Sequence, residues 1–244
     1  MVGRRTTPFA ALLDMPPVRL GEEESVRQLG VFAKYWQPGA VKTRLAAHWG
    51  DVAASRLSRG FLVAVLNRLA TRADRRLLVF TPAERRAEFA ELAAGRWELA
   101  PQTAGDLGQR MQGYFEAAFA AGARRVLLIG SDSPSLPCEL VERAFTLLET
   151  RDVVLGPTPD GGYYLVGAAD RVPPIFAGVA WSTPRVWEQT MEQVRVAGLS
   201  LAELPPWYDV DEPVDLARLR AELASRCDEP ELAQLARLVE QACA

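Results

Sequence analysis

Residues 126–134 have the sequence Val-Leu-Leu-Ile-Gly-Ser-Asp-Ser-Pro, and the predicted fold starts from this stretch. Its four bulky apolar residues predict a short buried strand, which Gly130 and Pro134 end. One carboxylate, Asp132, is left just beyond the strand. Ligands of open α/β sheets bind outside the carboxyl ends of strands, and Mg²⁺ typically takes one or two carboxylates together with substrate phosphates. We therefore expect Asp132 to bind a metal ion in an enzyme that acts on a nucleotide diphosphate.

Composition narrows the class of protein. The chain has 244 residues, 49% of them hydrophobic and 24% charged, as in an ordinary soluble globule. A net charge of −3 excludes a general nucleic-acid binder. The three cysteines, Cys138, Cys227 and Cys243, lack metal-ligand spacing and suit reduced thiols in a cytosol. The single histidine, His48, argues against a Ser-His-Asp hydrolase and is expected on a helix surface.

The N-terminal segment does not resemble a targeting signal. Its apolar piece, residues 9–13, is too short for a secretory signal and ends at Asp14. No apolar run approaches the ~20 residues that a membrane helix needs. We therefore expect a cytoplasmic protein with a poorly ordered extension or packing arm over residues 1–25 and one domain over 26–244.

Strand and helix signals alternate along the chain. Such alternation predicts a mostly parallel, mixed sheet covered by helices on both faces, a three-layer α/β/α fold. Right-handed crossovers would place the turns after the strands that end near residues 33, 80 and 130 at one edge of the sheet. The predicted strands are 29–33, 77–80, 97–100, 126–130, 152–155, 163–166 and 199–204. The predicted helices are 41–70 with a break at Gly50, 82–94, 106–121, 137–149, 184–197, 213–225 and 230–242.

The first turn after a strand, residues 33–45, combines a flexible backbone with positive charge. Gly39 lets the backbone approach a ligand closely, and Lys42 and Arg44 stand near a helix start, which already favours an anion. A solvated basic turn without a ligand is the alternative. The nucleotide-binding residues predicted from this region are Phe32, Ala33, Lys34, Gly39, Lys42 and Arg44.

The segment 156–165, Gly-Pro-Thr-Pro-Asp-Gly-Gly-Tyr-Tyr-Leu, has two interpretations. Asp-Gly-Gly between two strand signals is typical of a hairpin turn. Paired glycines beside Asp160 also suit a loop that folds over a small ligand. On the second interpretation, substrate contacts Asp160, Gly161, Gly162 and Tyr163, together with Trp181, which is a candidate to line a sugar.

Alternating acids precede the helix that starts at Pro213. Asp209 and Asp211 would point the same way on an extended segment. Capping of the helix by Asp211 or Glu212 explains one acid but not both alternating ones. Asp211 is therefore the predicted second metal ligand, opposite Asp132.

The segment 105–111, Gly-Asp-Leu-Gly-Gln-Arg-Met, opens the helix predicted over 106–121. Asp106 is a natural helix cap, and Gly105 permits close passage of a base or ribose. We include Gly105, Asp106, Ser131 and Asp132 among the predicted nucleotide-binding residues.

Taken together, these segments resemble the bacterial DUF2064 family of GT-A-type proteins, often labelled glycosyltransferases or nucleotide-diphospho-sugar transferases. The resemblance spans roughly 29–220, in the same order throughout. Ser133 stands where the family commonly has Cys. The matching motifs are Pro38 to Leu45, Gly105 to Met111, Gly130 to Pro134, Gly156 to Leu165, Trp181 to Thr183 and Asp209 to Leu216.

The resemblance implies a GT-A fold that binds a nucleotide sugar with Mg²⁺ or Mn²⁺. By this resemblance, Asp132 corresponds to the acidic metal-binding motif of GT-A proteins. Because Ser133 and Pro134 supply no second carboxylate, Asp211 is the expected second ligand. The expected reaction is metal-dependent transfer of a sugar from a nucleotide-diphosphate sugar to a small-molecule acceptor. Lys42 and Arg44 would stabilise the diphosphate, and Asp160 would be the general base.

Two other functions stay open. The turn at 40–45 also looks like the first loop of phospholactate guanylyltransferases. Residues 209–216 are similar to the corresponding part of molybdenum-cofactor guanylyltransferases and sugar-acid cytidylyltransferases. A nucleotidyltransferase would join a nucleoside triphosphate to a phosphorylated substrate and release pyrophosphate. A nucleotide-binding regulatory module without turnover is the third interpretation.

Overall fold

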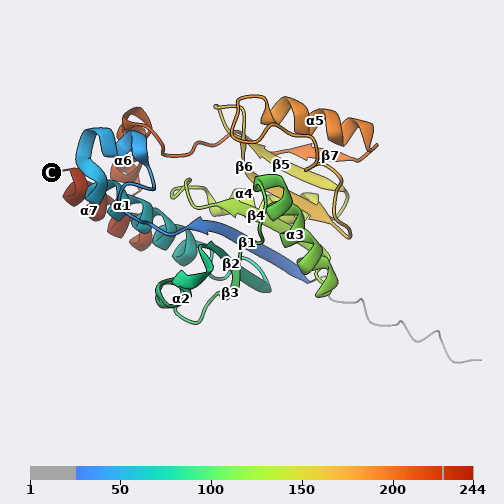
Figure 1. Ribbon diagram of the computed structural model, residues 1–244, viewed down its shortest axis with the longest axis horizontal. Helices are drawn as coiled ribbons and strands as arrows, with labels where there is room; N and C mark the ends of the chain where they lie inside the picture. The colour runs from blue at the N-terminus through green and yellow to red at the C-terminus, as the bar shows by residue number, and fades with distance from the viewer. Residues whose placement is uncertain (1–25, 227, 244) are drawn as a thin grey trace, which may run out of the picture.

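The computed structural model describes residues 26–226 and 228–243, so the extension expected over 1–25 lies outside the described residues. Strands and helices alternate as predicted (Figure 1). The strands are β1 (Arg27–Lys34), β2 (Arg75–Thr81), β3 (Glu98–Pro101), β4 (Arg125–Gly130), β5 (Val153–Pro157), β6 (Tyr163–Ala169) and β7 (Leu201–Glu203). The helices are α1 (Thr43–Arg68), α2 (Arg86–Ala93) after the short 3₁₀ turn η2 (Ala83–Arg85), α3 (Leu107–Ala120), α4 (Cys138–Leu147), α5 (Val186–Val196), α6 (Pro213–Ser225) and α7 (Pro230–Cys243).

The strands form one mixed sheet in the order β3-β2-β1-β4-β6-β5-β7. Strand β1 pairs in parallel with both β2 and β4, and β6 is antiparallel to its neighbours β4 and β5. The chain runs outward from β1 through β2 to β3 and then returns to the other side of β1 with β4. The sheet therefore has a topological switch point between β1 and β4, which is where open α/β sheets bind ligands.

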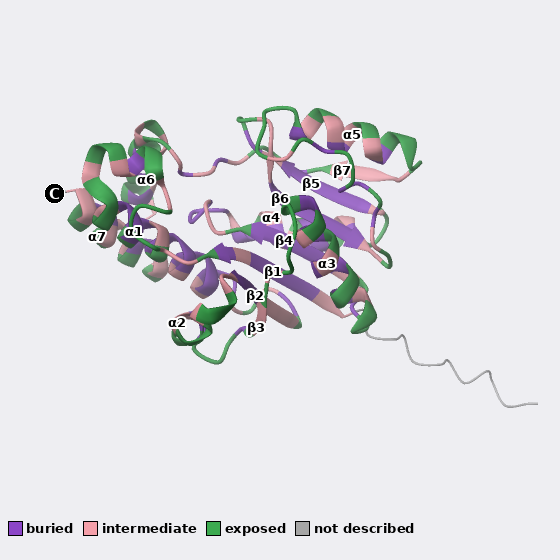
Figure 2. Cartoon of the chain, viewed as in Figure 1, coloured by how far each residue is buried: buried purple, intermediate pink, exposed green. Residues whose placement is uncertain are grey.

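Side chains of β4 alternate between the two faces of the sheet, so each face has its own core. Leu127 and Ile129 join the core beneath α1, α2 and α4, while Val126 and Leu128 join the core beneath α3 and α5. Figure 2 shows the strands buried between helices whose outer sides are exposed. The three-layer α/β/α fold predicted from the sequence is confirmed.

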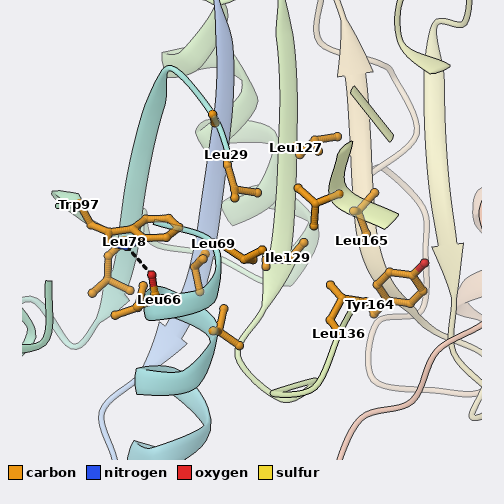
Figure 3. Packing of buried hydrophobic residues seen from close by; sticks show 14 of the residues in the cluster. Leu29, Leu66, Leu69, Leu78, Trp97, Leu127, Ile129, Leu136, Tyr164 and Leu165 are labelled. Carbon is orange, nitrogen blue, oxygen red and sulfur yellow. Dashed lines mark hydrogen bonds between the residues drawn. The ribbon is translucent and has the colours of Figure 1, made fainter. Parts of the chain in front are cut away.

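The end of α1 packs closely against the first of these cores (Figure 3). Leu66 and Leu69 contact the cluster that contains Leu29 of β1. The indole Nε1 of Trp97 donates a hydrogen bond of 3.1 Å to the carbonyl oxygen of Leu66. Without this bond the buried indole N–H would lack an acceptor, which would destabilise the folded state.

The first half of α1 belongs to a third core, shared with α6 and α7. The predicted break is present, because Gly50 has φ 80° and ψ 162° inside the helix. Phe61 of α1 lies in one cluster with Leu219 of α6 and Leu235 of α7. The terminal helices therefore pack at the end of the sheet where α1 begins.

Helix α4 begins without a side-chain cap. Its N-cap is Pro137, without a side-chain hydrogen bond, and the Ser135 hydroxyl bonds elsewhere. Asp132 does not cap this helix either, so the commonest structural role for such an aspartate does not apply to it. Across residues 26–226 and 228–243, no helix combines the length and the apolar character needed to cross a membrane.

Candidate active site

Two chain segments meet at the switch point of the sheet. The loop after β4 carries Asp132, and the segment after β7 runs back across the strand ends toward α6. The amide N–H of Val210 donates a hydrogen bond of 2.8 Å to the carbonyl oxygen of Asp132. Because Val210 is fully buried, Asp209 and Asp211 on either side of it face the opposite direction. The expectation that these two acids point the same way is met, since both line one cleft.

Lys42 lies at the centre of the acidic residues. Its Nζ lies 2.5 Å from Oδ1 of Asp132 and 2.8 Å from Oδ1 of Asp211. The ammonium also stands 5.7 Å from the centre of the Phe61 ring. The Lys42 side chain is 5% exposed, whereas both carboxylates are 46% exposed. The lysine thus fixes the two acids from the protein side and leaves them open to solvent on the other.

The electrostatics of Lys42 keep it charged. Burial alone would lower its pKa, but the charges of Asp132 and Asp211 outweigh burial and raise the pKa of Lys42 above 10.5. Its backbone adopts φ 47° and ψ 45° at the N-cap of α1. A left-handed conformation is unusual for a residue with a side chain and is often found at functional sites.

Asp209 is the member of this group that the sequence did not assign a role. Its Oδ1 accepts a hydrogen bond of 2.6 Å from the Ser133 hydroxyl. Burial, followed by the charge of Asp132, raises the pKa of Asp209 to about 7. The Asp-x-Asp spacing was the signal for this residue, because a segment that brings Asp211 to Asp132 must also bring Asp209.

The donor atoms at this point suit Mg²⁺ or Mn²⁺. Asp132 and Asp211 each place one carboxylate oxygen on the Lys42 ammonium, and carboxylate oxygens are the ligands that both ions prefer. Within the described part of the chain, no cluster of three or more His, Cys, Asp or Glu side chains is arranged to hold a metal alone. The residues therefore fit a metal bound jointly by two carboxylates and a substrate's phosphates. That metal stays a prediction.

A cleft of about 550 Å³ opens beside these acids. It brings together the basic turn, the 156–165 loop, the 181–183 motif and the acidic segment, which are far apart in the sequence. Arg44 is 69% exposed there and pairs with Glu212 at 3.2 Å. The lining residues are Lys42, Thr43, Arg44, Leu107, Thr158, Asp160, Gly162, Tyr163, Trp181, Ser182, Thr183, Pro184, Val186, Asp209 and Asp211.

The loop between β5 and β6 is a hairpin turn and also a wall of the cleft, so the two interpretations of its sequence are compatible. Asp160 Oδ1 accepts hydrogen bonds from the Thr158 hydroxyl at 2.5 Å and from the Gly162 amide at 3.1 Å. Gly161 does not line the cleft; a Cβ there would collide with the carbonyl of Pro184. Its role is to let the hairpin pack against the segment before α5.

Trp181 lines the cleft from the segment before α5. Its ring meets the Tyr163 ring edge to face, with centroids 6.3 Å apart. The indole lies directly on Gly108 of α3, where a Cβ would collide with it. Gly108 is therefore required for the packing of Trp181.

Known proteins resemble this chain over most of its length. The family described as "Uncharacterized protein conserved in bacteria (DUF2064)" matches residues 65–183. A 3-phospho-D-glycerate guanylyltransferase from Phenylobacterium zucineum (strain HLK1) is 33% identical over 183 residues, 71% of this chain and 81% of that protein. The chain belongs to the DUF2064 family.

Solved structures share the fold. A nucleotide-diphospho-sugar transferase, so described, from Desulfovibrio desulfuricans G20 is 35% identical with a TM-score of 0.81, covering 88% of this chain and 97% of that one. A nucleotidyl transferase from Methanothermobacter thermautotroptrophicus is 15% identical with a TM-score of 0.53, covering 82% of this chain and 99% of that one. The second likeness concerns the fold alone.

Only some of the residues predicted to bind nucleotide line the cleft. Several residues predicted to bind nucleotide do not line the cleft, and these are Phe32, Ala33, Lys34, Gly39, Gly105, Asp106, Ser131 and Asp132. Asp132 is joined to the cleft by its contact with Lys42. Lys34 lines a second hollow of about 540 Å³ at the ends of β1 and β2, and its Nζ donates to the carbonyl of Ala40 at 2.8 Å. Asp106 caps α3 as predicted, accepting a 2.8 Å hydrogen bond from the Gln109 amide.

The remaining predictions concern single residues. Phe32 packs edge to face on Tyr114, with ring centroids 6.1 Å apart. The carbonyl of Ala33 accepts a hydrogen bond from Gln102 at 3.3 Å. His48 lies exposed on α1, as expected. The nucleotide contacts of the residues outside the cleft stay predictions.

Proposed function

We propose that this DUF2064 protein is a nucleotidyltransferase. It joins the nucleoside monophosphate of a nucleoside triphosphate to the phosphate of a small phosphorylated acid. The observation that carries the proposal is the Lys42 ammonium between the carboxylates of Asp132 and Asp211 at the switch point of the sheet. This arrangement supports the proposal because fixed charges of both signs lie at the edge of the sheet, where open α/β folds bind their ligands.

The comparisons support nucleotidyl transfer over sugar transfer, which was the first expectation from the sequence. The relative that is 33% identical is a guanylyltransferase whose substrate is 3-phospho-D-glycerate. We therefore expect GTP as the donor and a phosphorylated hydroxy acid as the acceptor. The cationic Arg44, exposed in the cleft, suits an acceptor that carries a phosphate and a carboxylate.

In this reaction a phosphate oxygen of the acceptor attacks the α-phosphorus of the triphosphate. A phosphoanhydride bond forms, the bond between the α-phosphorus and the α–β bridging oxygen breaks, and pyrophosphate leaves with the bonding electron pair. A phosphate monoester has a second pKa of about 6, so it is mostly ionised at neutral pH and needs no general base. Asp160, expected to be a base for sugar transfer, is not needed for proton removal here.

Three charged residues of the site then have defined tasks. Lys42 holds the two acids in place from the protein side. Asp132 and Asp211 would hold Mg²⁺ or Mn²⁺, which supplies neutralisation of charge on the triphosphate oxygens when bound. Both side chains are 46% exposed, so they are accessible to such an ion from solvent.

Product analysis separates this function from its alternative. Glycosyl transfer keeps one observation in its favour, the 35% identical structure described as a nucleotide-diphospho-sugar transferase. The protein is incubated with Mg²⁺ and either GTP plus 3-phosphoglycerate or a panel of nucleotide sugars plus acceptors. We expect pyrophosphate and a guanylylated acid from the first mixture. Nucleoside diphosphate released from a nucleotide sugar, with no pyrophosphate from any triphosphate, would instead establish sugar transfer.

A further inference from the structure

The loop that follows Asp132 is held by two arginines from the helical end of the molecule. Arg68, the last residue of α1, donates to the carbonyl oxygens of residues 134 and 136 at 3.2 and 2.7 Å. Arg226, just after α6, donates to the carbonyl oxygen of residue 135 at 3.0 Å. Three consecutive carbonyls are thus bound by charged donors, which form stronger hydrogen bonds than neutral ones.

Glu222 of α6 connects this loop to the other acid-bearing segment. Its Oε2 accepts a hydrogen bond of 3.0 Å from the Ser135 hydroxyl and one of 2.5 Å from the Tyr208 hydroxyl. Ser135 follows Asp132 by three residues, and Tyr208 directly precedes Asp209. A single carboxylate oxygen therefore binds one side chain from each segment that carries the acids of the site.

This connection is buried. Ser135 is 1% exposed and Tyr208 is 3% exposed, while the Glu222 side chain is 18% exposed. The second oxygen of Glu222 pairs with Arg226 at 2.6 Å. Because each charge has a partner, the group forms a satisfied polar network, and such networks rigidify the backbone they bind.

A second bond joins the same two segments closer to the cleft. It is the hydrogen bond from the Val210 amide to the carbonyl of Asp132. With the Glu222 connection on the helix side and this bond on the cleft side, the two segments are fixed at two points. The separation of Asp132 and Asp211 follows from both.

We propose that Glu222 is a positioning residue, which sets the separation of Asp132 and Asp211 by binding Ser135 and Tyr208 at once. The inference rests on the proposed function, in which those two acids hold a divalent cation. Mg²⁺ requires near-ideal geometry from its ligands. Groups that orient the metal ligands without contacting the metal strongly affect metal affinity. α6 thereby acts on the site without touching a substrate.

Mn²⁺ binding in the presence of a non-hydrolysable GTP analogue tests this proposal, with electron paramagnetic resonance as the readout. Glu222→Leu removes the acceptor and should weaken Mn²⁺ binding about tenfold or more, the usual effect of losing such a partner. Glu222→Gln keeps an acceptor oxygen and should stay closer to wild type. Hydrogen exchange at residues 131–136 and 206–211 should quicken in Glu222→Leu.

Glu240→Gln is the matched control. Glu240 of α7 pairs with Arg220 of α6 at 2.8 and 2.9 Å on the surface, so it joins the same helices but contacts neither acid-bearing segment. It should leave both Mn²⁺ affinity and exchange unchanged. An equal loss in Glu240→Gln and Glu222→Leu would show that only helix packing matters and would overturn the proposal.

Asp132→Asn separates failure of this inference from failure of the proposed function. If Asp132→Asn binds Mn²⁺ like wild type, the proposed metal site itself is wrong, and the role of Glu222 in setting it is wrong too. If Asp132→Asn loses Mn²⁺ while Glu222→Leu keeps it, only the positioning role is overturned. Should Glu222→Leu not fold, the double variant Ser135→Ala/Tyr208→Phe removes the same two hydrogen bonds and keeps the Tyr208 ring against Arg218.

Discussion

Lys42 and Asp211 are 169 positions apart in the sequence, yet the Lys42 ammonium donates a hydrogen bond of 2.8 Å to the Asp211 carboxylate. The same ammonium contacts Asp132, so one lysine joins the first turn of the sheet to its fourth strand and to the entry of α6. Removing one partner of such a buried pair leaves the other charges uncompensated. The ion pairs of Lys42 therefore determine both the stability of the site and the charge that it presents.

Lys42→Met should therefore affect activity and stability together. We expect kcat/KM for pyrophosphate release to fall about 100-fold or more, the size of effect seen when a preorganised charge is removed from a reaction centre. Asp132 and Asp211 would then repel each other, and the melting temperature should fall. Steady-state kinetics and thermal unfolding check both expectations.

Lys42→Arg should not restore activity. A guanidinium is planar and larger than an ammonium, and it cannot sit as a compact point charge between two carboxylates and the Phe61 ring. We expect nearly the same kinetic loss as in Lys42→Met with a smaller loss of stability. Activity near wild type in Lys42→Arg would mean that charge alone, without this geometry, is sufficient.

Gly108→Ala should damage the cleft through Trp181. A Cβ at Gly108 would lie 2.7 Å from the carbonyl oxygen of Phe176 and would also collide with the Trp181 indole. We expect a loss of about 1–3 kcal/mol in unfolding free energy, typical of overpacking, and a raised KM for the acceptor. Urea denaturation and kinetics measure the two effects.

Gly113→Ala provides the comparison on the same helix. A Cβ there would lie 3.0 Å from Oγ1 of Thr103, a side chain rather than backbone. We expect a smaller stability change and an unchanged acceptor KM. If both variants raise that KM equally, the effect comes from a general disturbance of α3 and not from the packing of Trp181 on Gly108.

The sequence predicted most of this fold because its elements are locally determined. The apolar run at 126–129 with Gly130 after it favoured a buried strand, and Gly50 marked a break in α1, where the structure has a positive φ. Asp106 and Pro213 likewise marked helix starts that the structure has. Each of these signals depends on neighbours in the chain, so no knowledge of the packing was needed.

The site was less predictable because it depends on which strand ends become neighbours. The spacing of Asp209 and Asp211 indicated a shared direction, but only the sheet order places them opposite Asp132. Glu222 carried no signal at all, since an acid on an amphipathic helix is ordinarily solvated. The hairpin at Asp160 combines both kinds of feature. Local hydrogen bonds explain much of its sequence, whereas its position beside the cleft depends on packing.

Asp152 provides a prediction about pH at the far end of the sheet. Hydrogen bonds from the Ser200 hydroxyl at 2.6 Å and the Ser200 amide at 2.8 Å lower the pKa of Asp152 from 3.8. A carboxyl with a lowered folded pKa contributes stability above its unfolded pKa and loses it as pH falls through the folded value. Ser200→Ala should thus cost about 1 kcal/mol at pH 7, because Asp152 is partly exposed.

The same difference should shrink as the pH falls below 3.8. Urea denaturation of wild type and Ser200→Ala, from pH 7 down to the lowest pH at which both stay folded, measures it. A stability difference independent of pH would show that the serine acts through packing and not through the charge of Asp152.

The most direct test of the central claim is calorimetric titration of a non-hydrolysable GTP analogue, with and without Mn²⁺, into wild type, Asp132→Asn and Asp211→Asn. We predict Mn²⁺-dependent binding to wild type and its loss in both variants, which keep the fold because their side chains are half exposed. Equal affinity for the analogue in all three proteins, or an affinity that is the same with and without Mn²⁺, would contradict the assignment of these two aspartates to a nucleotide–metal site.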